Sequence, residues 1–180
     1  MTLRSVVPET LGSVVGGLAG PAGPQNNPAL LRLNLGCCDR RVGGYLGVDR
    51  VPGAAVDIVA DLTERWPWND GAVERILAHD IIEHLPDKIH TMNELYRVLT
   101  VGGEAEICVP TTDGRAAWQD PTHVSFWNRH SFWYYEAGNP YRERFAKSYG
   151  IIAAFRVKGE TKQDTLDGPK LLIWLVKVVQ

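Results

Sequence analysis

The chain has few cysteines, and their spacing narrows the chemistry that they can do. The three of them, Cys37, Cys38 and Cys108, are an odd number, two are adjacent, and none shows the spacing of a metal site. This pattern argues against a disulfide framework and indicates reduced thiols, as in a cytosolic protein.

The sequence also lacks a long apolar run and an excess of one charge. Near its start a single arginine precedes a weak apolar stretch that glycines interrupt, which is poor as a signal peptide and too broken to span a bilayer. The net charge of -2 gives no long-range attraction to phosphate backbones or anionic membranes. We therefore expect a cytoplasmic protein with a small-molecule substrate and without a nucleic-acid or membrane partner.

What the chain does have is enough apolar sequence for one globular domain. Its 180 residues are 44% apolar and 22% charged, which leaves no room for a second full domain. Residues 1–28 hold five glycines and four prolines, so we expect a flexible arm there, with a helical turn near residues 9–15. The single domain is predicted over residues 29–180.

Short β-rich runs, each ending in polar residues, predict a mostly parallel sheet. They cover residues 32–35, 46–49, 56–61, 75–80 and 104–110. A helix is expected over residues 87–99, with Gly102-Gly103 as its stop. Residues 151–158 and 171–178 predict an antiparallel pair at one sheet edge. The connections between the first three strands are about ten residues or fewer, so helices there must be reduced.

The first two of these runs point to a nucleoside-containing cofactor. The strand around Leu31–Leu35 breaks at Gly36, and the next strand ends in the carboxylate of Asp49. A glycine after a buried strand lets the backbone approach a ligand, and an acidic side chain at the neighbouring strand tip can accept hydrogen bonds from a ribose diol. Taken alone, a strand-ending glycine and a turn-forming aspartate also have ordinary structural explanations.

Five ordered elements together resemble class I S-adenosylmethionine-dependent methyltransferases, in particular the small type 11 group. These elements are Leu33-Asn34-Leu35-Gly36-Cys37, Gly44–Asp49, Val56-Asp57 with Asp61-Leu62, Asp80–Leu85, and Leu95–Leu99 followed by Gly102-Gly103. The resemblance implies an α/β fold, a doubly wound, mostly parallel seven-stranded Rossmann-like sheet with an antiparallel C-terminal strand pair. Two positions depart from the family pattern: Cys38 stands where a further glycine is usual, and Val101 where a proline is usual.

The same resemblance implies S-adenosylmethionine as the cofactor and assigns residues to it. The turn of Asn34, Gly36 and Cys37 would cradle the methionine end through backbone amides. Asp49 would accept both ribose hydroxyls.

Two further strand ends would hold the adenine and the amino group. Asp61 would receive the adenine amino group and the Leu62 amide a ring nitrogen, although Asp61 could equally cap the turn over residues 62–65. The carbonyls of Ala78 and His79 would face the cofactor's amino group; for His79 a hydrogen-bonded strand-end histidine is the alternative.

Two clusters lie outside this cofactor set. Asp80, Glu83 and His84 have helical spacing, but the companion ligands expected at short spacing are absent, so we predict no metal. In the aromatic-rich loop after residue 110, His123 of Asp120-Pro121-Thr122-His123 is the best candidate for a catalytic base. His130, Tyr134 and Tyr135 are weaker candidates. The loop could form a lid over the acceptor, yet its histidine could merely orient a turn and its aromatics could be core.

The predicted function is methyl transfer from S-adenosylmethionine to an oxygen, nitrogen or carbon of a small-molecule acceptor. One alternative is a non-catalytic S-adenosylmethionine-binding protein or partner subunit of the same fold. A nicotinamide-dependent oxidoreductase is a third option, disfavoured because the full Gly-x-Gly-x-x-Gly turn is missing and Asp49 comes earlier than the usual offset of about 20 residues.

Overall fold

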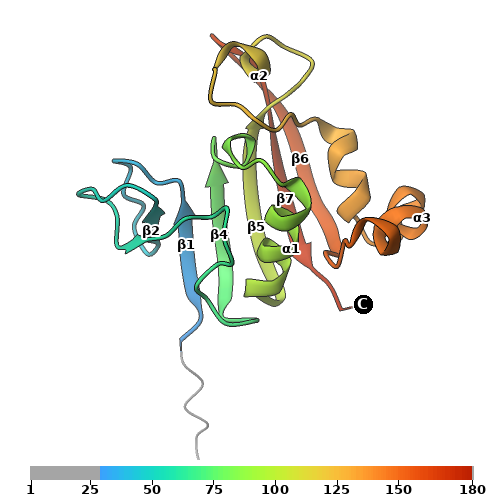
Figure 1. The fold of residues 1–180 in the computed structure, drawn as a ribbon, viewed down its shortest axis with the longest axis horizontal. Coiled ribbons are helices and arrows are strands. Elements are labelled where there is room, and N and C mark those ends of the chain that lie inside the picture. Colours follow the sequence, from blue (N-terminus) through green and yellow to red (C-terminus); the bar gives the residue numbers. More distant parts are fainter. Residues whose placement is uncertain (1–28, 180) are drawn as a thin grey trace, which may run out of the picture.

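A seven-stranded sheet organises residues 29–179, which are the residues that the computed structural model describes. The arm predicted for residues 1–28 lies outside the described residues. The strand order is β3-β2-β1-β4-β5-β7-β6 (Figure 1). The strands are β1 (Leu31–Leu35), β2 (Leu46–Asp49), β3 (Ile58–Val59), β4 (Val73–His79), β5 (Leu99–Pro110), β6 (Phe155–Thr165) and β7 (Gly168–Lys177).

The pairing confirms the predicted fold class. β3, β2, β1, β4 and β5 are parallel to one another, whereas β7 runs antiparallel to both β5 and β6. The carboxyl ends of the five parallel strands therefore share one edge of the sheet. Among residues 29–179, no helix combines the length and apolarity that a membrane crossing requires.

The third strand is shorter than the predicted run over residues 56–61, and aspartate side chains accept main-chain amides beside both its ends. Before β3, the Asp57 carboxylate accepts the Gly47 amide at 2.8 Å. After it, the Asp61 carboxylate accepts the Thr63 amide at 2.9 Å. Such aspartate turns compete with a strand ladder for the backbone.

The helical elements are few: η1 (Ile82–His84), α1 (Lys88–Val98), α2 (Ala116–Gln119), η2 (Arg129–Tyr135) and α3 (Pro140–Tyr149). α1 begins as predicted, since the Asp87 carboxylate caps the amides of Ile89 and His90. The prediction that Gly102-Gly103 stops it is wrong. The chain turns extended at Leu99 and enters β5 at once, and Gly102, with a φ of 79°, lies inside that strand.

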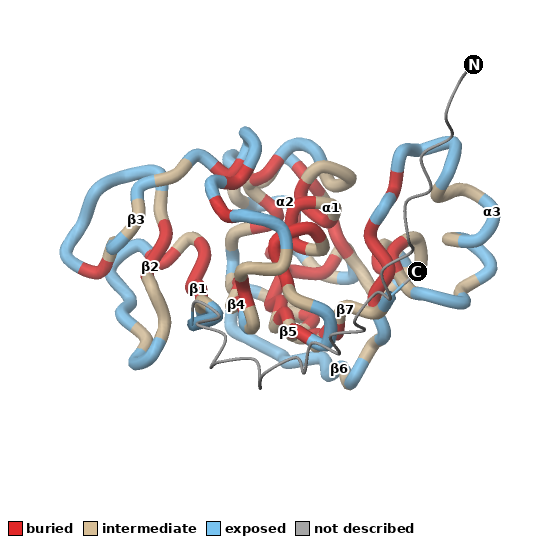
Figure 2. The backbone as a smooth tube through the Cα atoms, turned by 90° about the horizontal axis from the view of Figure 1, so that it is seen from below, coloured by how far each residue is buried: buried red, intermediate tan, exposed pale blue. Residues whose placement is uncertain are grey.

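Between β1 and β4, the described chain contains no helix, which fits the short connections and the predicted reduction of helices. The core lies on one face of the sheet, where α1 and the loops cover the central strands (Figures 1 and 2). Its largest fully buried side chains include Leu33, Ile76, Met92, Trp66 and Trp127.

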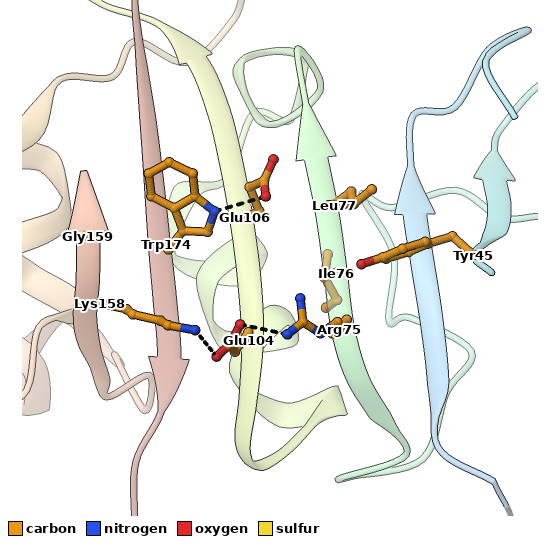
Figure 3. A pocket seen from close by; sticks show the side chains of 9 residues that line it. All are labelled: Tyr45, Arg75, Ile76, Leu77, Glu104, Glu106, Lys158, Gly159 and Trp174. Atoms are coloured by element: carbon orange, nitrogen blue, oxygen red, sulfur yellow. Dashed lines mark hydrogen bonds and ion pairs between the residues drawn. The ribbon is translucent and has the colours of Figure 1, made fainter. Parts of the chain in front are cut away.

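The opposite face of the central strands carries charged side chains. Glu104 of β5 bridges Arg75 of β4, at 3.2 Å, and Lys158 of β6, at 2.6 Å (Figure 3). Two residues further along β5, Glu106 accepts a hydrogen bond from the indole N–H of Trp174 at 2.9 Å. Polar and apolar residues thus alternate along β5, a pattern more typical of a sheet with one solvated face than of a parallel sheet covered on both.

A buried ion pair fastens the segment before β4 to α1. Arg97 donates to both carboxylate oxygens of Glu94, from Nε at 2.8 Å and from Nη2 at 2.6 Å, and the two residues are 9% and 8% exposed. Arg97 also donates to the carbonyls of Trp66 and Trp68, and Glu94 accepts the Trp66 amide. This network provides hydrogen-bond partners for main-chain groups of the segment between β3 and β4. In a regular crossover, a helix at this place would form those hydrogen bonds within itself.

We expect Arg97→Ala to lower the free energy of unfolding by about 3–5 kcal/mol, because the substitution leaves the Glu94 carboxylate buried without its partner. Urea denaturation followed by circular dichroism measures the change. The matched control is Arg65→Ala, since Arg65 meets Asp70 only at 3.9 Å and its side chain is 75% exposed. The control should change stability by less than about 1 kcal/mol. Equal losses in the two variants would contradict the role given to the buried pair.

Candidate functional site

A cavity of about 460 Å³ opens at the carboxyl edge of the sheet. Its volume falls within the range of roughly 300–1,000 Å³ that is usual for small-molecule sites. Segments that follow four successive strands, together with the turn after α2, supply its walls: Gly36, Asp49, Arg50, Ala60, Asp61, Leu62, Thr63, Ile81, His84, Leu85, Thr122 and Val124.

The turn after β1 forms one wall and needs glycine at its first position. Gly36 has a φ of +61°, and a Cβ there would lie 2.8 Å from the Ile81 side chain. Cys38 also takes a left-handed angle, with a φ of 50°, at the position where the family usually has a further glycine. The structure thus retains the glycine-type turn at Cys38 at the cost of backbone strain.

Asp49 faces the cavity from the tip of β2 and is held there by two amides. One carboxylate oxygen accepts the Cys38 amide at 2.9 Å, and the other accepts the Val51 amide at 3.0 Å. An ionised carboxylate has about four lone-pair sites, so acceptor capacity remains for two further donors. This is the group that the sequence assigned to a ribose diol.

Asp61 and Leu62 lie across the cavity, after β3. The Asp61 carboxylate accepts the amide and hydroxyl of Thr63, and these hydrogen bonds lower its pKa below the ordinary value. The turn-capping explanation considered for Asp61 is therefore realised, and the same residue also lines the cavity. Leu62 is buried, and its carbonyl accepts the Trp66 indole N–H at 3.0 Å.

The other predicted cofactor residues do not line this cavity. Asn34 is buried and donates to the Arg40 carbonyl at 3.0 Å, which shapes the loop after β1. Cys37 is buried with its thiol 3.6 Å from the Ala55 carbonyl, and burial raises the pKa of that thiol. Ala78 is fully buried in β4. Their cofactor roles, which would run through the backbone of these strand ends, stay predictions.

His79 points to the charged face of the sheet. Its Nε2 lies 2.8 Å from Glu106, and its Nδ1 lies 3.1 Å from the Arg40 guanidinium. The side chain is thus the hydrogen-bonded strand-end histidine that the sequence left open as an alternative, and only its backbone remains for the cofactor role.

The loop after β5 folds back onto η1 through a compact turn. The Asp120 carboxylate accepts the amide and hydroxyl of Thr122, at 2.8 and 2.6 Å. The Glu83 carbonyl accepts the amides of Val124 and Ser125, both at 2.9 Å. These main-chain bonds fix His123, which lies between them, against η1.

The result is a cluster of Glu83, His84 and His123. One possible ligand atom from each lies within 4.8 Å of the others. The His123 Nε2 is 4.0 Å from the Glu83 carboxylate and also 4.0 Å from that of Asp120. Glu83 is 2% exposed, and within residues 29–179 neither carboxylate oxygen has a hydrogen-bond partner. Burial raises the pKa of Glu83 to about 8.

Sequence reasoning singled out His123 and the Glu83-His84 pair but did not connect them, and it predicted no metal for Glu83 and His84. The signal was the order of the strands: η1 follows β4, the His123 turn follows β5, and β4 and β5 are neighbours with parallel tips. His84 lines the cavity, whereas the predicted base His123 lies behind it, 8% exposed in its side chain.

The aromatic loop is divided between core and surface. Trp127, Phe132 and Tyr135 are buried, as in the core interpretation, and burial raises the pKa of Tyr135. Trp118 is 59% exposed and stacks on Phe126 with ring centroids 4.3 Å apart. Among the weaker base candidates, His130 stacks on Trp133, and Tyr134 packs among Tyr141, Phe145 and Tyr149. None of the three lines the cavity.

Comparison with known proteins agrees with this geometry. Residues 34–107 match the family model of a methyltransferase domain. The matched segment includes the cavity-lining residues from Gly36 to Leu85. No curated protein matches the chain.

Solved structures share the fold at low identity. An S-adenosylmethionine-dependent methyltransferase from Archaeoglobus fulgidus has a TM-score of 0.55 at 17% identity, over 83% of this chain and 87% of that one. The complex of the Haloferax volcanii Trm112 methyltransferase activator with a methyltransferase gives 0.55 at 15% identity, over 83% and 85%. A 16S rRNA (adenine(1408)-N(1))-methyltransferase from Catenulisporales acidiphilia, with the cosubstrate, gives 0.52 at 12% identity, over 83% and 85%.

We expect Cys38→Gly to raise the free energy of unfolding by about 0.5–1 kcal/mol. Relief of the left-handed strain gains more than the added freedom of the unfolded chain costs. The control is Cys38→Ala, which removes the thiol but keeps the β-carbon. Urea denaturation of both variants separates the two effects, and an equal gain in the alanine variant would show that strain is not the cause.

Proposed function

On the premise that residues 34–107 are a methyltransferase domain of the type 11 group, we propose that the chain transfers a methyl group from S-adenosylmethionine to a small-molecule acceptor. The observation that carries the proposal is the cavity at the carboxyl edge of β1, β2 and β3, with Asp49 and Asp61 on its walls. Ligands of open α/β sheets bind at this edge.

The residues present fit this cofactor. Asp49 retains lone pairs for two hydroxyl donors at a fixed position, which suits a ribose diol. Asp61 and the Leu62 backbone lie on the wall where an adenine edge would complete the nucleoside. The Gly36 turn leaves the main chain free of a side chain at the edge nearest β1. Two ionised carboxylates also suit a cofactor that carries a positive sulfur.

When bound, S-adenosylmethionine supplies a methyl group on a positively charged sulfur, which keeps the bonding electrons as an acceptor lone pair takes the methyl. The work left to the protein is alignment and exclusion of water. Asp49, which the amides of Cys38 and Val51 hold in place, would fix one end of the cofactor. His84, Thr122 and Val124 form the opposite wall, and the acceptor would lie against them.

The acceptor class is part of the proposal. The chain has a net charge of -2. Among the residues that line the cavity, Arg50 is the one with a positively charged side chain. That surface favours a small molecule over a polyanion. The rRNA-modifying relative shows that the same fold also serves nucleic acid, so an RNA acceptor is the competing outcome of an acceptor screen.

We expect Asp49→Asn to weaken cofactor binding at least tenfold, since the substitution removes the charge that strengthens both ribose hydrogen bonds. Calorimetric titration with S-adenosylhomocysteine measures the dissociation constant, and a thermal melt checks folding. The control is Asp39→Asn, which makes the same charge change at an exposed residue outside the cavity. An Asp49→Asn protein that binds as tightly as the control would remove Asp49 from the ribose role.

A second experiment tests the function itself. Wild-type protein is titrated in parallel with S-adenosylmethionine and with NAD, and then incubated with radiolabelled S-adenosylmethionine and metabolite and RNA extracts. Saturable binding of the first alone, followed by label in a small-molecule fraction, is expected. Binding of NAD alone would refute the methyltransferase proposal. Cofactor binding with no labelled product in any fraction would favour a binding protein or partner subunit.

A further inference from the structure

We propose that Glu83, His84 and His123 form a binding site for one divalent transition-metal ion, best suited to Zn²⁺, at the wall of the cofactor cavity. The three residues come from η1 and from the turn after α2, and one ligand atom of each lies within 4.8 Å of the others. Metal binding itself is independent of the proposed function. A role for the ion in holding the acceptor rests on that function.

The hydrogen bonds of both imidazoles leave a ring nitrogen ready for a metal. The His123 Nδ1 is 3.2 Å from the Ala117 carbonyl, which can only accept, so Nδ1 carries the proton and Nε2 has the free lone pair. The His84 Nδ1 lies 3.2 Å from the Thr122 carbonyl and 3.0 Å from the Thr122 hydroxyl. That hydroxyl gives its own proton to Asp120, so His84 also donates from Nδ1 and keeps Nε2 free.

Such a backbone carbonyl behind each imidazole is the usual outer shell of a metal-bound histidine. It fixes the tautomer and the direction of the ligating nitrogen before an ion arrives. Both histidines of the cluster have this support: the carbonyl behind His84 belongs to Thr122 in the turn that delivers His123, and the one behind His123 belongs to Ala117 of α2.

Glu83 supplies the second, independent observation. Its side chain is 3% exposed, and both oxygens lack a hydrogen-bond partner among the described residues. A buried carboxylate without hydrogen bonds is costly, and native proteins normally pair it or use it to bind an ion. His123 does not pair it, because the 4.0 Å separation is too long for a hydrogen bond.

A bound ion would give the three side chains a common partner. With ligand distances of about 2.0–2.2 Å, the three donor atoms would stand roughly 3.0–3.6 Å apart, so side-chain shifts of about 1 Å complete the site. Asp80 and Asp120 add negative charge around Glu83, and Lys170, which pairs with Asp80 at 2.7 Å, offsets part of it.

The donor set selects the kind of metal. Two neutral imidazoles and one carboxylate suit Zn²⁺ and its neighbours Fe²⁺, Co²⁺ and Ni²⁺, whereas Mg²⁺ and Ca²⁺ prefer oxygen donors alone. Three protein ligands leave at least one coordination position open. Because His84 lines the cofactor cavity, that position would face it, and an acceptor oxygen could bind there and lose its proton more easily.

The test uses the full chain without a polyhistidine tag, stripped with a chelator and titrated with Zn²⁺ against a chromophoric competitor. We expect one equivalent to bind, with 1 mM Mg²⁺ unable to compete. Glu83→Gln and His123→Asn should each weaken Zn²⁺ at least tenfold. His90→Ala is the control, since His90 lies on α1, where its Nε2 is 3.0 Å from the Glu64 carbonyl, and is outside the cluster. Absence of saturable binding in the wild type, or unchanged affinity in both cluster variants, would overturn the site.

Two further measurements distinguish the proposed metal site from the cofactor site and from a role of the metal in holding the acceptor. Titration with S-adenosylhomocysteine should give unchanged affinity in folded Glu83→Gln and His123→Asn proteins, while Asp49→Asn should keep its Zn²⁺ affinity and bind the nucleoside at least tenfold more weakly. In the Co²⁺ form, acetohydroxamate, a small oxygen chelator, should shift the visible absorption spectrum in wild type. Zn²⁺ binding without this shift would overturn the open coordination position. Cofactor failure with Zn²⁺ retained would refute the proposed function alone.

Discussion

Parallel pairing of the five strands from β3 to β5 is the constraint on which the site depends. Because the strands point the same way, the turn after each one must emerge at the same edge of the sheet. Gly36, Asp49 and Asp61 meet around one cavity for this reason, although they are spread along the chain. The same geometry brings the turn after α2 onto η1, where the Glu83 carbonyl receives two amides. The chemistry of the site is thus a property of the sheet edge.

The strand pattern and the cofactor wall could be predicted because they are local. β1, β2 and the start of α1 follow from an apolar run, a glycine break or an aspartate cap within a few residues. The extent of β3, the end of α1 and the orientation of His79 could not, since each depends on partners elsewhere: Asp57 with Gly47, β5 directly after α1, and Glu106 with His79. The pairing of Glu83 with His123 is non-local in the same way.

A sheet with so few helices must satisfy its loops by other means. Between β3 and β4 the Arg97–Glu94 pair and two tryptophans take the place of a crossover helix, and they do so from inside the core. On the opposite face, chains of ion pairs such as Arg75–Glu104–Lys158 lie over the central strands (Figure 3). One face is therefore held by burial and the other by charge, which salt weakens.

The exposed Cys38, in the turn after β1, offers a single site for chemical labelling. Of the three thiols, those of Cys37 and Cys108 are buried and have raised pKa values, whereas Cys38 is exposed. The Cys38 amide is hydrogen-bonded to the carboxylate that faces the cavity. A maleimide dye would therefore attach at this one position, and its fluorescence would report the arrival of a nucleoside without any knowledge of the acceptor.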